Sequence, residues 1–137
     1  MSDYSKKRLI RQQFETFDFG GGADEVFSLR LPKNENGGNM QGQLVNVGVM
    51  VTEVINADTA PTVQVGTAAD NDAYAKLEIA DGTADEDCFD VSDDTDAILN
   101  ANIPAGTLVE INYTAGSGTS GGAVTGQGMP FLDMYVW

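Results

Sequence analysis

The segment from Leu44 to Ile55 alternates between two faces, and this pattern constrains the fold more than any other feature of the chain. One face carries Val45, Val47, Val49 and Val51, and the other carries Asn46, Gly48, Met50 and Thr52. A repeat of two residues places successive side chains on opposite sides of a β-strand. The segment is therefore predicted to be a long strand that buries its valine face.

Shorter segments of the same character recur along the chain and are predicted strands: 26–31, 61–65, 74–79, 88–91, 108–113 and 130–137. Turn residues separate them, and Asp81-Gly82 is expected to close a two-residue hairpin between two of these strands. Residues 93–100 alone favour a helical turn. About seven or eight short strands predict an all-β fold, an antiparallel β-sandwich, and the lack of longer helices excludes alternating βαβ units.

The length of 137 residues fits one compact domain. Three consecutive glycines, Gly20 to Gly22, have the composition of a hinge. We therefore expect an extended N-terminal arm with its glycine hinge at residues 1–22, followed by a β-sandwich domain at residues 23–137.

Basic residues are concentrated at the start of the chain. Six of the seven lie within the first 33 positions, whereas Lys76 stands alone among sixteen acidic residues after them, a net charge of −15 for that part. An acidic body repels polyanions, and four basic residues in the arm are few for nucleic acid or a membrane surface. Neither is an expected partner.

The arm combines these charges with bulky apolar side chains, which favours a protein partner. We expect the arm to bind an acidic protein surface, its charges pairing with carboxylates and its phenylalanines packing there. A disordered terminus is the alternative. The predicted partner-binding residues are Lys6, Lys7, Arg8, Arg11, Phe14, Phe17 and Phe19.

Catalytic residue combinations are scarce. The chain has no histidine, so no Ser-His or Cys-His pair exists, and Cys88, the single cysteine, is expected to be structural. The spacing of Gly116-Ser117-Gly118-Thr119-Ser120-Gly121 matches a dinucleotide fingerprint, but no helix and acid-bearing strand follow. We expect neither an enzyme nor a cofactor.

Acidic clusters at residues 70–72 and 85–96 raise the question of calcium. Neither has the spacing and central glycine of an EF-hand loop. Solvated loops are therefore the expectation and no metal ligand is assigned, with a calcium site built from two loops as the alternative.

No run of about 18 apolar residues occurs, as a membrane span would need. Leu9-Ile10 is followed by Arg11-Gln12-Gln13 instead of the apolar core of a signal peptide. We expect synthesis and assembly in a cytoplasm.

The chain resembles small virion proteins of tailed bacteriophages, in particular the jelly-roll capsid decoration or cement proteins. The resemblance spans residues 44–137 and rests on Thr62-Val63-Gln64-Val65-Gly66, an acidic loop to Tyr74, Ile103-Pro104-Ala105-Gly106-Thr107 before Val109 to Tyr113, and a Gly-rich loop before a terminal aromatic strand. It implies a jelly roll that forms homotrimers on the outside of the capsid, contacts the major capsid protein and stabilises contacts between capsomers.

Apolar residues near the C-terminus fit the same expectation, because a monomer would leave them poorly covered. The predicted oligomer contacts are Met129, Phe131, Met134 and Trp137. Two alternatives remain. One is the base of a phage fibre or spike, in which the sandwich binds a receptor or glycan. The other is a carbohydrate-binding module, with stacking platforms at Tyr4, Tyr74, Tyr113, Tyr135 and Trp137.

Overall fold

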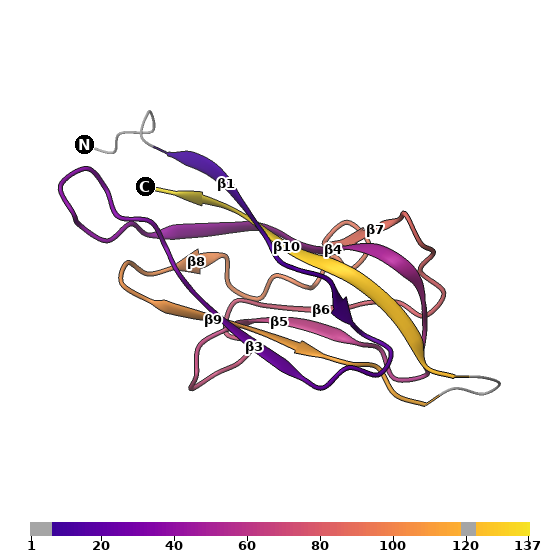
Figure 1. Cartoon of the computed structure of the whole chain (residues 1–137). Coiled ribbons are helices and arrows are strands. Elements are labelled where there is room, and N and C mark those ends of the chain that lie inside the picture. The colour runs from indigo at the N-terminus through magenta and orange to yellow at the C-terminus, as the bar shows by residue number, and fades with distance from the viewer. Residues whose placement is uncertain (1–6, 119–122) are drawn as a thin grey trace.

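Ten strands in two antiparallel sheets make up the described part of the chain, which in this computed structural model is residues 7–118 and 123–137 (Figure 1). The first sheet has the order β1-β10-β4-β7, with β2 also pairing with β10 and β8 with β4. Its strands are β1 (Arg8–Gln13), β2 (Phe17–Asp18), β4 (Gly42–Asn56), β7 (Cys88–Asp90), β8 (Asn102–Ile103) and β10 (Thr125–Val136). The predicted β-sandwich is confirmed.

The second sheet has the order β3-β9-β5-β6. Its strands are β3 (Glu25–Arg30), β5 (Thr62–Gly66), β6 (Ala75–Glu78) and β9 (Leu108–Thr114). Antiparallel pairs are nested along the chain, since β1 pairs with β10, β3 with β9, β4 with β7 and β8, and β5 with β6. Strands from the two ends of the sequence therefore lie side by side.

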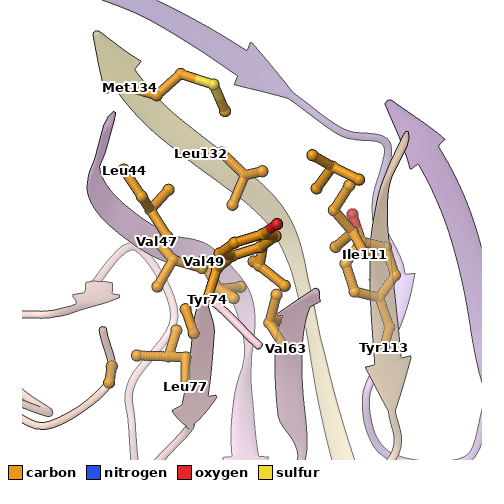
Figure 2. Packing of buried hydrophobic residues seen from close by; sticks show 14 of the residues in the cluster. Leu44, Val47, Val49, Val63, Tyr74, Leu77, Ile111, Tyr113, Leu132 and Met134 are labelled. Carbon is orange, nitrogen blue, oxygen red and sulfur yellow. The ribbon is translucent and has the colours of Figure 1, made fainter. Parts of the chain in front are cut away.

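The core fills the space between the two sheets (Figure 2). Every second side chain of β4 and β10 points inward from the first sheet. Every second side chain of β5, β6 and β9 points inward from the second sheet and packs against them. Figure 2 shows Leu44, Val47, Val49, Leu132 and Met134 from the first sheet facing Val63, Leu77, Ile111 and Tyr113 from the second.

The prediction of an arm separate from the sandwich is wrong for residues 8–19. Arg8 to Gln13 pair with Phe131 to Val136 as β1, which lies alongside β10 in Figure 1. Phe17 and Phe19 are buried in the core, with their ring centroids 4.8 Å apart. The sheet hydrogen bonds and aromatic burial hold this segment to its own chain, so the domain boundary at Gly22 does not exist.

The glycines predicted as a hinge form a tight turn instead. Asp18 fixes it, because its carboxylate oxygen Oδ1 accepts a hydrogen bond from the Gly20 amide at 3.0 Å and its carbonyl accepts one from the Gly22 amide at 3.0 Å. The Gly20 amide also donates to the Gly126 carbonyl at the start of β10.

A β-bulge in β4 changes which residues face the core, so the prediction that Val45 is buried is wrong. Pairing with β10 shifts between Asp133↔Asn46 and Met134↔Leu44, so that Val45 is left over. Leu44 takes the inward place and Val45 is exposed. The valine face is therefore buried from Val47 onward, and the alternation alone did not reveal the extra residue.

Two smaller predictions also change. Asp81-Gly82 is a turn, with Gly82 at a φ of 83°, but the strands before and after it belong to different sheets and do not form a hairpin. Residues 93–100 form turns instead of a helical segment. The last strand begins at Thr125, before the predicted start at Pro130.

Replacing Tyr113 with Phe is expected to stabilise the protein. Tyr113 is buried among Phe14, Phe17, Phe19 and Phe27, and its hydroxyl has no hydrogen-bond partner within the described residues. Burial, aided by the charge of Glu25, raises the pKa of this hydroxyl, which stays protonated. Removing a buried unpaired hydroxyl should raise the free energy of unfolding by about 1 kcal/mol, measured by urea denaturation.

The matched control is Tyr135→Phe, because that hydroxyl lies at an exposed position and its removal should leave stability unchanged. Lower stability in the Tyr113→Phe protein would show that the hydroxyl has a bonding partner.

Candidate interaction surface on the first sheet

The outer face of the first sheet brings together residues that the sequence assigned to two different contacts. Lys7 and Arg11 come from the predicted arm, whereas Phe131 and Trp137 come from the predicted oligomer contact. Antiparallel pairing of β1 with β10 places Leu9 opposite Tyr135 and so sets these residues beside one another. We call the resulting group the β1–β10 cluster: Lys7, Arg11, Phe131, Asp133, Tyr135 and Trp137.

Arg11 is fixed in this cluster by two carboxylate oxygens and one aromatic ring. Its Nε donates to Asp133 Oδ1 at 2.6 Å and its Nη2 donates to Asp133 Oδ2 at 2.8 Å. The guanidinium carbon lies 4.3 Å from the centroid of the Phe131 ring. A bidentate pair combined with a cation–π contact orients the guanidinium more strictly than a single ion pair would.

Phe131 lies on the outer face and is nevertheless only 1% exposed. Its neighbour across the strands is Gly48, and a Cβ at that position would meet ring carbon Cζ at 2.4 Å. The ring therefore occupies the space left by the missing side chain of Gly48 and is also in contact with the guanidinium of Arg11. This explains why the sheet tolerates a large aromatic residue there.

Lys7 contacts a second pair of aromatic rings in the cluster. Its Nζ lies 4.4 Å from the centroid of the Trp137 ring and 5.3 Å from that of Tyr135. It also donates a hydrogen bond to Gln43 Oε1 at 3.0 Å. Both described cations on this face therefore contact aromatic rings of β10.

A polar network extends the face toward β7. Asn46 Nδ2 donates to Asp90 Oδ2 at 3.1 Å, and the Ser92 hydroxyl donates to Asp90 Oδ1 at 2.7 Å. Partial burial acts to raise the pKa of the Asp90 carboxyl, but the hydrogen bonds from Ser92 and Asn46 outweigh it and hold that pKa below its usual value. Partial burial and the charge of Asp90 raise the pKa of the neighbouring Cys88 thiol, which disfavours the reactive thiolate.

The remaining predicted site residues lie elsewhere. Phe17, Phe19 and Met134 are buried inside the chain, and Phe14 packs against Phe27 with ring centroids 5.9 Å apart. The predictions that Phe17 and Phe19 fill a partner's pockets and that Met134 contacts another copy are therefore wrong, because these side chains are buried in the protein's own core. Lys6 lies outside the described residues.

Met129 lies on the same outer face, two residues before Phe131 on β10, whereas Arg8 belongs to a different surface. Met129 is half-buried and pairs with Met50 of β4. Arg8 has the opposite orientation to Lys7 and lines a cleft of about 210 Å³ between edge strand β1 and the segment that follows β3, together with Ile10, Met40 and Val136. Lys7 and Arg8, which are adjacent in the sequence, thus belong to two different surfaces.

A metal ion would need several acidic or cysteine side chains close together. Across residues 7–118 and 123–137, no three of them gather closely enough to bind an ion. The same residues include no helix long and apolar enough to cross a membrane.

Sequence reasoning missed Asp133, Gly48 and Asn46 as parts of this surface. The sequence around β1 can be divided into the two faces of a strand. Lys7, Leu9, Arg11 and Gln13 belong to one face, and Arg8, Ile10, Gln12 and Phe14 belong to the other. Both sets mix polar and apolar residues, so the alternation gives no clear apolar face.

No protein-family model, curated protein or solved structure matches this chain. What the protein does is therefore inferred from its own fold and surface.

Replacing Gly48 with Ala should destabilise the protein by about 1–3 kcal/mol, the usual cost of forcing extra atoms into a packed site. The new methyl group would displace the Phe131 ring and with it the guanidinium of Arg11. The measurement is urea denaturation, and Phe131→Leu should reduce the cost of Gly48→Ala.

Gly21→Ala is the control, because a Cβ there would contact only Asp18 Oδ2 at 4.0 Å. If Gly48→Ala proves as mild as Gly21→Ala, the ring does not rest on the glycine.

Proposed function

We propose that this chain is a structural protein of a bacteriophage virion, a capsid decoration or cement protein that binds the outer capsid through the β1–β10 cluster. The observation that carries the proposal is the meeting of two cations, from β1 and the residue before it, with three aromatic residues, from β10 and the residue after it, on one face. Arginine, tyrosine and tryptophan are the residues that most often dominate protein–protein binding energies.

We also infer that the sandwich is a jelly roll. The nested pairing of β1 with β10, β3 with β9, β4 with β7 and β8, and β5 with β6 supports this topology. It is the architecture that the sequence resemblance implies for capsid decoration proteins.

The position of the cluster suits a rigid attachment surface. Its side chains stand on two paired strands and hold one another through the Arg11–Asp133 pair and the Lys7 contacts. Binding therefore costs little side-chain entropy, which favours affinity. The net charge of −14 on the whole chain keeps particles coated with it from associating.

The proposal includes the remaining expectations from the sequence. The partner is the major capsid protein, the protein assembles as a homotrimer in the host cytoplasm, and it has neither catalytic activity nor a cofactor. Its attachment site moves from the predicted arm to the first sheet, because the arm phenylalanines are used internally.

Rebinding to capsids that lack the protein tests the proposal. Arg11→Ala and Tyr135→Ala should each weaken binding by about tenfold or more, since interface anchors contribute about 2 kcal/mol and 1.4 kcal/mol corresponds to tenfold. Occupancy is measured by quantitative electrophoresis of purified particles across a concentration series.

The controls are Arg30→Ala and Val26→Ala, a cation and an exposed apolar residue on strand β3 of the second sheet. They should bind as the unaltered protein does. Equal binding by all four variants would exclude the first sheet as the attachment surface, and absence of binding by the unaltered protein would exclude the capsid as partner.

A glycan-binding role is the second candidate. Tyr135 and Trp137 present neighbouring rings beside Lys7, an arrangement that suits stacking against a sugar. Tyr74 and Tyr113, two other predicted platforms, are buried, and Tyr4 lies outside the described residues. Binding to immobilised glycans without capsids, abolished by Tyr135→Ala, would favour this role over capsid decoration.

A further inference from the structure

Most basic residues of the fold lie toward one lateral edge, and a strongly acidic segment lies at the other. Strands β1 and β3 are the edge strands on one side of the two sheets, whereas β6 and β7 are the edge strands on the other. Arg8, Arg30 and Lys33 belong to the first side. The segment from Asp81 to Asp96, next to β7, contains eight acidic residues and no basic one.

A cleft opens at the basic edge between the two sheets. Arg8 and Lys33 contribute its charges, and Ile10, Met40 and Val136 contribute apolar walls, with Glu35 and Asn34 completing the lining. An adjoining hollow of about 170 Å³ reaches Trp137. Apolar walls beside two cations suit an apolar side chain that carries carboxylates next to it.

Arg8 and Lys33 form no ion pair with a described carboxylate, although Glu35 lines the same cleft. Among residues 7–118 and 123–137, the ion pairs are Arg11–Asp133 and Lys76–Glu78. No described carboxylate therefore lies within ion-pairing distance of Arg8 or Lys33, and both side chains are exposed.

The acidic edge presents a side chain of the required kind. Leu99 is 58% exposed, and Asp93, Asp94 and Asp96 precede it in the same segment. Its backbone is held in place, because the Leu99 amide donates to the Tyr74 carbonyl at 2.9 Å. Ala97 is buried just before it. The leucine is thus presented on a fixed backbone.

We propose that copies of this chain associate head to tail, with Leu99 of one copy seated in the Arg8–Lys33 cleft of the next. The aspartates at 93–96 would then face the two cations. The inference rests on the self-association included in the proposed function and identifies its contact. Because the two surfaces are different and lie on opposite edges of one molecule, the contact can repeat from copy to copy, and it forms a ring such as a trimer where the rotation between copies closes. The outer face of the first sheet stays free to bind another protein.

Complementation between two variants tests this contact in solution, without capsids. The cleft variant carries Arg8→Glu with Lys33→Glu, and the knob variant carries Leu99→Ser. Each should associate at least about tenfold more weakly than the unaltered protein, as expected when an interface anchor is lost. Each variant retains the surface that the other lacks. An equimolar mixture should therefore form a one-to-one dimer, detected by light scattering with size-exclusion chromatography.

Matched controls separate the contact from the general effect of replacing an exposed apolar residue. Val26→Ser and Val54→Ser alter valines of β3 and β4 that are 57% and 45% exposed. Both controls should associate as the unaltered protein does, and circular dichroism should show every variant folded. Added salt should weaken association of the unaltered protein, because it screens exposed charges.

Three results would overturn the inference: an unaltered protein that is monomeric throughout the concentration series, variants that associate normally, or a mixture that does not dimerise. None of these bears on whether the β1–β10 cluster binds capsids, since that binding is measured separately with Arg11→Ala and Tyr135→Ala.

Discussion

The two-sided pairing of β10 is the interaction on which the rest of the structure depends. The strand pairs with β4 along one edge and with β1 and β2 along the other, so it joins both ends of the chain within one sheet. Its inward side chains Leu132, Met134 and Val136 are buried. On its outward face, Phe131 and Asp133 contact Arg11 of β1, and Tyr135 contacts Lys7 just before that strand. Core and surface thus depend on the same register. Because the pairings of β10 with β1 and β2 link residues more than a hundred positions apart, they raise the contact order of the fold, which slows folding.

Sequence alternation was sufficient to predict the strands whose two faces differ clearly in polarity. Residues 108–113 show this well, since Val109, Ile111 and Tyr113 are buried while Leu108, Glu110 and Asn112 face outward. The long strand β4 was predicted for the same reason, and so was the sandwich. In each case burial of one face provides the stabilising free energy, and that face is visible in the sequence as a repeat of two.

The remainder depends on contacts between distant residues. The first strand could not be predicted because its polarity is mixed on both faces, and its position is fixed only by β10. The bulge at Val45 results from fitting β4 to β10 and leaves no mark in the sequence of either strand. Which sheet a strand joins also depends on residues far away in the sequence. Asp81-Gly82 therefore has the sequence of a hairpin turn, yet it connects strands of two different sheets. The candidate surface was missed as a unit for the same reason, although five of its six residues had been named.

Strand β1 illustrates how an exposed edge is used without inviting aggregation. An open edge strand has unpaired backbone groups to which another strand can add, and charged side chains discourage that addition. Lys7, Arg8 and Arg11 supply such charges here, with Lys7 and Arg11 on the outer face and Arg8 toward the cleft. Partners that recognise side chains can still approach both surfaces, because they do not need the backbone of β1. In the two contacts that we propose, the charges that protect this edge would also meet the partners: Lys7 and Arg11 on the outer face, and Arg8 in the cleft.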